Sequence, residues 1–124
     1  MPKPLPIQSL NHVAVVTSRL EASRRFYRDV LGLKLLPHHG DRPHFDVDGT
    51  YLVILKGQLP PAKNAEPPSF PLFAISVDDL NAMIARLEHH QISLFHGIES
   101  DESSRWVMFH DLAGNLIELV EFKS

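Results

Sequence analysis

Residues 11–20 read Asn-His-Val-Ala-Val-Val-Thr-Ser-Arg-Leu, and this short stretch decides the fold. Residues 11–16 are mostly apolar and β-branched, which predicts a strand buried on both faces. Thr17 and Ser18 come next, and their hydroxyls are typical of a helix N-cap. The stretch therefore predicts a buried strand that leads directly into a helix.

The rest of the first half continues this unit. The predicted helix ends at Gly32, since glycine often lies just past a helix C-terminus. The apolar side of the helix consists of Leu20, Phe26, Tyr27, Val30 and Leu31. Further strands are predicted over residues 33–36, 44–47 and 50–55, and Asp48-Gly49 between the last two is a strong hairpin signal. The predicted order is β-α-β-β-β.

The second half repeats this order. Residues 72–77 predict a strand, and Asp78 or Asp79 caps the helix that follows. Its apolar residues recur with helical spacing at Leu80, Met83, Ile84 and Leu87. Strands are predicted over 92–95 and 105–110, and a turn over 111–115 leads into a last strand over 116–122.

The two halves can be aligned by a nearly constant offset. Adding 60 places Val15 on Ile75 and Leu20 on Leu80, and adding 65 later places Gly49 on Gly114. Between the halves, residues 57–71 contain five of the ten prolines, which excludes a helix or a central strand there. We therefore predict an α+β fold. A single domain, 1–124, contains two tandem βαβββ modules, 8–56 and 70–123, joined by a proline-rich linker, 57–69.

Composition narrows the class of protein. The chain has 124 residues, of which 44% are hydrophobic and 22% charged, so it can build a core. The absence of cysteine excludes a disulfide scaffold, a thiolate nucleophile and an iron–sulfur cluster. A net charge of −3 without a basic stripe argues against nucleic-acid binding. With no membrane-length apolar run and no secretory signal, we expect a cytoplasmic protein that binds a small molecule.

Two polar residues stand out within the predicted strands. Glu118 lies among apolar residues of both strand faces, where an unpaired carboxylate is costly, so we interpret it as a metal ligand or a catalytic base. The alternatives are an edge-strand glutamate that reaches water and one paired with an arginine. His12 has a similar setting, and it is either a metal ligand or a hydrogen-bonded core histidine.

The repeat and the hairpins predict which side chains share a face with them. Equivalent positions are His12 and Leu72 on the opening strands, and Val53 and Glu118 on the closing strands. The Asp48-Gly49 turn pairs His44 with Val53, and the later turn can place His110 opposite Leu116 on the face of Glu118. Trp106 and Met108 share the parity of His110 and could line an apolar wall. Otherwise His44 caps a strand start, and His110 is a solvated turn residue.

Three stretches resemble a known family. They are Asn11-His12-Val13-Ala14-Val15, Phe26-Tyr27-Arg28-Asp29-Val30-Leu31-Gly32-Leu33 and Asp111-Leu112-Ala113-Gly114-Asn115-Leu116-Ile117-Glu118-Leu119. The chain is similar to the vicinal oxygen chelate superfamily, which contains glyoxalase I, bleomycin-resistance proteins and extradiol dioxygenases. The third stretch resembles that family's D-P-D-G-N-x-I-E-L ending, with Leu112 and Ala113 replacing two residues of it.

The resemblance implies paired βαβββ modules that curl into a cup, usually completed in a homodimer. It also implies a divalent metal ion, such as Zn, Ni, Mn or Fe, held by histidine and glutamate. His12 and Glu118 match two ligand positions, whereas Val53 and Leu72 occupy the others and cannot coordinate. Such a site is weak unless His44, His110 or the bound molecule completes it.

Two hypotheses follow. The first is a glyoxalase-like enzyme, a metal-dependent lyase or isomerase or a dioxygenase-like protein, that acts on a small oxygenated metabolite, with Glu118 as catalytic residue. The second is a metal-free protein of the bleomycin-resistance kind, which sequesters an apolar or aromatic molecule in the cup. In both, His44, Val53, Leu72, Trp106, Met108 and His110 contact the small molecule.

Overall fold

The computed structural model describes residues 5–58 and 70–123. The first module contains β1 (His12–Thr17), α1 (Leu20–Arg25), a π-helix η1 (Phe26–Val30), β2 (Lys34–Leu35), β3 (His44–Val47) and β4 (Thr50–Lys56). The second contains β5 (Phe73–Ser76), α2 (Leu80–His89), β6 (Phe95–Ser100), β7 (Ser104–His110) and β8 (Leu116–Phe122). The predicted α+β class with two modules is confirmed.

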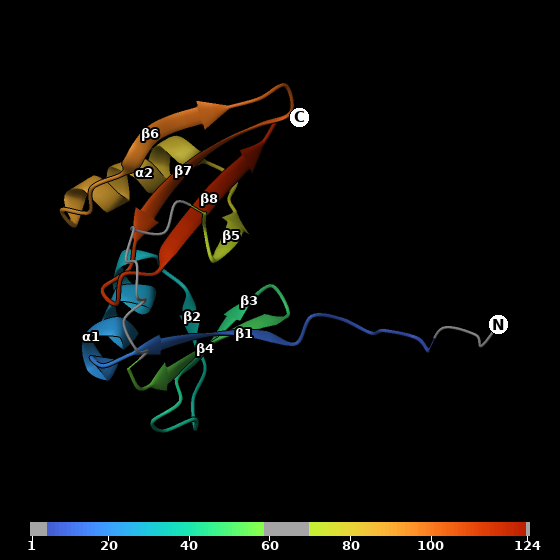
Figure 1. Ribbon diagram of the computed structural model, residues 1–124, viewed down its shortest axis with the longest axis vertical. Coiled ribbons are helices and arrows are strands. Elements are labelled where there is room, and N and C mark those ends of the chain that lie inside the picture. Colours follow the sequence, from blue (N-terminus) through green and yellow to red (C-terminus); the bar gives the residue numbers. More distant parts are fainter. Residues whose placement is uncertain (1–4, 59–69, 124) are drawn as a thin grey trace, which may run out of the picture.

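Each module forms one four-stranded mixed sheet, with the order β1-β4-β3-β2 in the first and β5-β8-β7-β6 in the second. In both, the opening strand runs parallel to the closing strand, and the other pairs are antiparallel. Figure 1 shows the second module above the first, with β5 facing the sheet of β1, β3 and β4. The modules therefore have the same topology.

The strand register confirms the internal repeat residue by residue. Ala14 of β1 pairs with Val53 of β4, and Ala74 of β5 pairs with Glu118 of β8. Val53 and Glu118 are thus equivalent positions, as the offset predicts. The two hairpin predictions are also confirmed, because His44 pairs with Val53 and His110 with Leu116.

A single hydrophobic core joins the two modules. Its buried members come from the helices and from one face of each sheet: Val15, Phe26, Tyr27, Leu31, Phe45, Leu52, Ile54, Leu80, Leu87, Val107, Phe109, Ile117 and Leu119. The prediction that the first strand is buried on both faces is wrong. Only the side of Val13 and Val15 packs on the core, and His12 and Ala14 on the other side are exposed.

Among the described residues, two side chains, Tyr27 and Arg86, form hydrogen bonds between the modules. The Tyr27 hydroxyl donates a 2.6 Å hydrogen bond to the Asp111 carboxylate. Arg86 of α2 donates through Nε to the Val30 carbonyl at 2.7 Å and through Nη2 to the Asp29 carbonyl at 2.9 Å. Arg86 thus satisfies carbonyls at the C-terminal end of η1, where a cation is favoured.

The start and the middle of the first helix differ from the prediction. The N-cap is Arg19, which makes no side-chain capping bond, because a guanidinium can only donate. The hydroxyl of Thr17, a predicted cap, accepts from the Arg19 N–H and from the Ser23 hydroxyl. The chain then widens into the π-helix η1, which sequence periodicity does not predict. In α2 the predicted cap is confirmed at Asp79, whose side chain accepts from the Ala82 N–H.

The strand predicted over 92–95 is also displaced. Ile92 and Leu94 pack against the core without strand pairing, and β6 begins only at Phe95. The register of β6 on β7 shifts between Phe95 and Glu99, and His96 and Gly97 in this interval have positive φ. This irregularity lets one strand continue past residue 97 toward the turn at Asp101.

The module limits 8–56 and 70–123 stay predictions. Most of the predicted linker, residues 59–69, lies outside the described part of the chain. Within residues 5–58 and 70–123, no helix is long and apolar enough to cross a membrane. The predicted cytoplasmic location is not tested by this result.

Candidate functional site

The sheet faces that point away from the core contain the predicted site residues. We call them the first cup face, on β1, β4 and β3, and the second cup face, on β5, β8, β7 and β6. On the first face, strand pairing places His12 beside Tyr51, Ala14 beside Val53, and Val53 beside His44. Two of the predicted site histidines therefore lie on one sheet, with the buried Val53 next to His44.

His44 is fixed by its neighbours. Its Nδ1 lies 2.6 Å from the Arg42 carbonyl oxygen, and a carbonyl can only accept, so Nδ1 is the donor. Its ring stacks on that of His39, with 3.9 Å between centroids, and lies 6.2 Å from the Tyr51 ring. In the neutral imidazole, Nε2 keeps the lone pair that can bind a metal ion or accept a proton.

The second cup face combines one carboxylate with apolar and aromatic groups. Glu118 pairs with Met108 and Met108 with Phe95, while Trp106 lies between Val120 and Glu99. The His110 ring meets the Phe95 ring edge to face at 5.4 Å. Met108 and Trp106 thus lie on the same sheet face as Glu118, as strand parity predicts, and their role as a pocket wall stays a prediction.

Glu118 is half-buried. Loss of solvation raises the pKa of its carboxyl group above the ordinary value, and the nearby charge of Glu99 raises it further. Among residues 5–58 and 70–123, its side chain has no ion-pair partner, so the interpretation as a glutamate paired with arginine fails.

Sequence reasoning missed Phe95 and Glu99 as members of the second cup face. Both belong to β6, whose predicted range ended at Phe95. Counting back from the turn around Asp101, which accepts hydrogen bonds from the backbone of Ser103 and Ser104, would have paired Glu99 with Trp106. The turn was thus the signal that could locate Glu99, whereas Phe95 pairs with Met108 only after the register shift and could not be located by counting.

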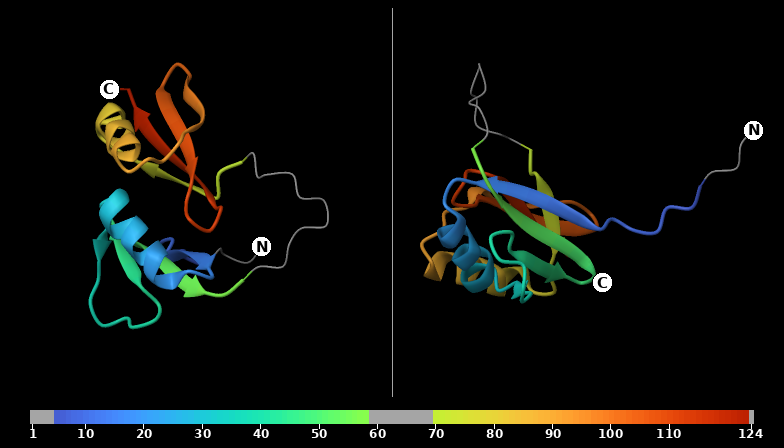
Figure 2. Two further views of the ribbon diagram at one scale, coloured as in Figure 1. Left: turned by 90° about the vertical axis from the view of Figure 1, so that its left-hand side faces the viewer. Right: turned by 90° about the horizontal axis from the view of Figure 1, so that it is seen from below.

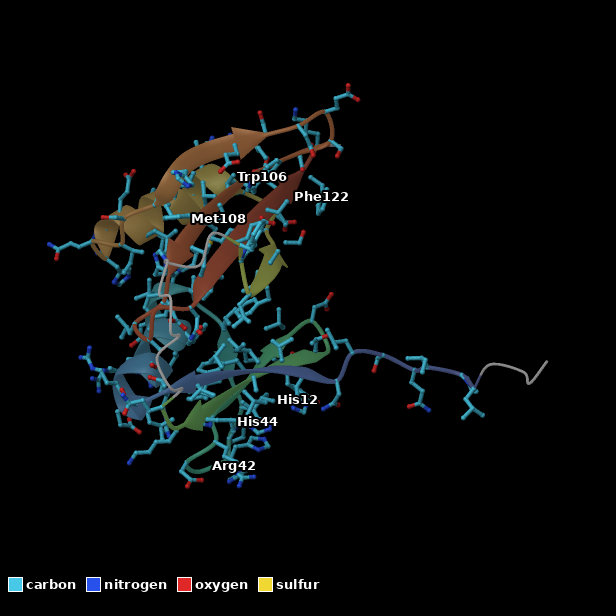
Figure 3. All side chains as sticks on the ribbon, in the orientation of Figure 1. His12, Arg42, His44, Trp106, Met108 and Phe122 are labelled. Atoms are coloured by element: carbon cyan, nitrogen blue, oxygen red, sulfur yellow. The ribbon has the colours of Figure 1, made fainter. Side chains whose placement is uncertain are left out.

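One chain does not bring the two cup faces together. Figure 3 shows His12 and His44 on the first module and Trp106 and Met108 on the second. Within the described residues, no three histidine, aspartate or glutamate side chains are grouped closely enough to hold a metal ion. Leu72 precedes β5 and is exposed.

The family assignment rests on the match of one sequence model. The model of the Glyoxalase/Bleomycin resistance protein/Dioxygenase superfamily matches residues 9–119 of this chain. The match covers most of the chain, and the paired modules agree with it. The chain belongs to this superfamily.

The chain is similar to proteins of three different kinds. A metallothiol transferase FosB of Lysinibacillus sphaericus is 29% identical over 92% of this chain and 82% of its own length. A glyoxalase/dioxygenase structure from Nostoc punctiforme is 21% identical, with a TM-score of 0.80 over 100% of this chain and 99% of that one. TnmS3, an antibiotic binding protein from Streptomyces, is 25% identical, with a TM-score of 0.76 over 97% of this chain and all (100%) of that one.

Proposed function

We propose that this protein binds and acts on a small oxygenated metabolite, in a cup formed by the first cup face of one chain and the second cup face of another. The observation behind the proposal is the second cup face, where Glu118 lies beside Met108, with Trp106 and Phe95 on the neighbouring strands. Apolar walls with a few polar groups are typical of small-molecule sites. The single domain 1–124, with modules 8–56 and 70–123, is the unit that pairs.

Glu118 is the proposed catalytic residue. Its raised pKa brings the carboxyl group closer to neutral pH, where an acid or base exchanges protons most effectively. In this proposal, Met108 and Trp106 exclude water from the surroundings of Glu118. The packed rings of His110 and Phe95 form one end of the second cup face. A carbon atom next to a carbonyl or hydroxyl of the substrate is the position where Glu118 would move a proton.

A divalent metal ion fits this proposal only in the two-chain cup. Within one chain the described donors do not converge. Across two chains, the candidate ligands are His12 and His44 of one and Glu118 of the other, and two imidazoles with one carboxylate suit Zn, Ni, Mn or Fe. A bound metal would supply Lewis acidity toward vicinal oxygens of the substrate. The resemblance to the FosB metallothiol transferase supports testing for it.

Metal content is the first measurement. Protein purified without a histidine tag is compared with a His12→Ala, Glu118→Ala double variant and with a His89→Ala, His90→Ala control, whose histidines are exposed on and beside α2. We expect about one metal ion per chain in the native protein and in the control, and loss in the double variant. No metal in the native protein, even after incubation with all four metals, would exclude the metal-dependent form.

The second candidate function is metal-free sequestration of an apolar or aromatic molecule. Val53 and Leu72 favour it, because neither can coordinate, and TnmS3 is an antibiotic binding protein of the same fold. Trp106 is the only tryptophan, so its fluorescence reports directly on the second cup face. Binding of an aromatic probe that survives chelator and is lost in Trp106→Ala would support this function, whereas loss with chelator would support the first.

A further inference from the structure

The loop between β2 and β3, residues 36–43, is fixed to the rest of the first module although it lies at the surface. Arg24 of α1 donates through Nη2 to the Gly40 carbonyl at 2.9 Å, and the Arg42 N–H donates to the His39 carbonyl at 3.0 Å. Figure 2 shows this segment, which we call the β2–β3 loop, in teal beside α1. Its conformation is therefore held both by the helix and by its own backbone.

The β2–β3 loop turns back so that it meets His44, the first residue of β3. Two of its residues, His38 and Gly40, have positive φ, of 69° and 54°. A non-glycine residue with positive φ is uncommon and persists where surrounding contacts impose it. The reversal brings His39 and Arg42 to the imidazole of His44 at the same time. The loop conformation thus makes two contacts to a single side chain.

These two contacts restrain different properties of the His44 ring. The Arg42 carbonyl oxygen, 2.6 Å from Nδ1, accepts its N–H and so selects the tautomer with the proton on Nδ1. This bond does not fix the ring plane, since rotation about the last side-chain bond of a histidine has broad minima. The His39 ring does fix the plane, because its centroid lies 3.9 Å away and the two rings are only 19° from parallel. Together the contacts hold Nε2, with its lone pair, in one direction.

The side chain of Arg42 takes no part in this arrangement. Within residues 5–58 and 70–123 it forms neither a hydrogen bond nor an ion pair, and the bond to His44 comes from the Arg42 backbone. His39 and Arg42 are both exposed, so replacing either side chain leaves the core intact. The two positions form a matched pair, in which one contacts His44 through its side chain and the other through its backbone.

We propose that His39 is a positioning residue, whose ring holds the His44 imidazole so that Nε2 meets the molecule or the metal ion in the cup. His39 itself contacts neither. The inference rests on the proposed function, which places His44 in the site, and it adds the β2–β3 loop as the support of that histidine. Loss of a group that orients a ligating histidine weakens metal affinity by about 10- to 100-fold.

The affinity for Zn²⁺ alone, measured by competition with a coloured chelator, is the first test. We expect His39→Ala to weaken zinc binding at least about tenfold, and His39→Phe, which keeps a flat ring for stacking, to restore most of it. Arg42→Ala is the matched control and should leave the affinity unchanged. No weakening in His39→Ala would overturn the proposal. Equal weakening in His39→Ala and His39→Phe would overturn it as well, because His39 would then act through its nitrogen atoms.

The second test, ¹⁵N NMR of the imidazole rings, needs no bound metal. The His44 signals are assigned by comparison with His44→Gln, in mildly alkaline solution. We expect one tautomer, with the proton on Nδ1, in the native protein and in Arg42→Ala. In His39→Ala we expect both tautomers, because an unrestrained ring also leaves the Arg42 carbonyl.

The two tests separate failure of this inference from failure of the proposed function. Both tautomers in the native protein, or an unchanged His44 spectrum in His39→Ala, would overturn the positioning role of His39. A native protein that binds no zinc or other metal contradicts the metal-dependent form of the proposed function instead. The NMR result then decides the role of His39 by itself.

Discussion

Two glutamates on β8 have carboxyl pKa values shifted in opposite directions, although they lie only three positions apart. Glu118 faces the cup, where loss of solvation and the charge of Glu99 raise the pKa of its carboxyl group. Glu121 accepts a hydrogen bond from the Leu80 N–H at 2.7 Å and lies 3.3 Å from Arg105, and these contacts lower its pKa. The two faces of one strand thus shift the pKa of the same type of side chain in opposite directions.

Replacing Glu118 with glutamine should stabilise the fold at neutral pH. Because the folded-state pKa is raised, the ionised carboxylate weakens the fold once the pH exceeds that pKa, and the penalty is absent below the unfolded-state pKa. We expect Glu118→Gln to raise the free energy of unfolding at pH 7 by less than about 1 kcal/mol, since solvent screens a half-buried group. Urea unfolding at neutral pH, where the penalty is present, and near pH 4, where it should largely disappear, measures the difference between the variant and the native protein.

Glu121→Gln is the matched control, with the opposite sign. Its lowered folded-state pKa means that the carboxylate stabilises the fold above the unfolded-state pKa, and this contribution is lost as the pH falls through the folded-state value. The variant should be less stable than the native protein at neutral pH, with the difference shrinking in acid. Equal pH profiles for the two variants would contradict the assignment of the two faces.

The Tyr27 hydroxyl is a buried link between the modules. Burial and the neighbouring Asp111 raise its pKa far above the ordinary range, so it stays protonated and donates. In Tyr27→Phe, the Asp111 carboxylate still accepts hydrogen bonds from the N–H groups of Ala113 and Asn115, but it loses the bond from the first module. We expect a loss of about 1.5–3 kcal/mol in the free energy of unfolding, measured by urea titration. A loss below about 0.5 kcal/mol would mean that the bond contributes nothing net.

At the scale of the elements, the cap of α2 gives a direct comparison. Asp79 accepts from the Ala82 N–H at 3.0 Å, whereas its neighbour Asp78 makes no hydrogen bond to the described part of the chain. Asp79→Ala should cost about 1 kcal/mol in unfolding free energy, and Asp78→Ala should stay within about 0.5 kcal/mol of the native value. Thermal and urea unfolding of both variants test this. Equal effects would contradict the assigned cap.

Most elements could be predicted because their signals are local. The Asp48-Gly49 turn defined the pairing of β3 and β4, and the stripe from Leu80 to Leu87 defined α2. The π-helix η1 and the start of β6 could not be predicted, because both depend on packing between distant segments. The ring of Phe26 in η1 packs against the ring of Phe109 in the other module, with 6.3 Å between ring centroids. Ile92, before β6, packs against the core and pairs with no strand.

At the scale of the whole molecule, mixing two inactive variants distinguishes a cup between chains from a cup within one. His12→Ala removes a functional side chain from the first cup face of every site, and Glu118→Ala removes one from the second cup face. After unfolding and refolding together, a two-fold symmetric dimer should regain intact sites amounting to about one quarter of the total. Metal content or probe binding measures the recovery. No recovery would contradict the two-chain cup.

The composition of the candidate site was partly predictable for the same reason as the fold. Strand parity correctly grouped His44 with Val53, and Met108 with Glu118. Parity does not indicate where the two faces lie relative to each other, since that depends on how the modules share a core. Burial was overestimated for His12 and Glu118, because apolar neighbours on both parities do not reveal that one sheet face is open in a single chain.

The repeated register, Ala14 with Val53 and Ala74 with Glu118, has a consequence for the ancestry of the chain. A half-length forebear that paired with itself would have lined its pocket with every side chain twice. Such a lining can recognise only a molecule whose two ends are alike, or bind an uneven one in two orientations. In this chain the equivalent positions hold Val53 and Glu118, so a cup that combined the two faces would present a different side chain at each end. Such a lining has the asymmetry that recognition of a molecule with two unlike ends requires.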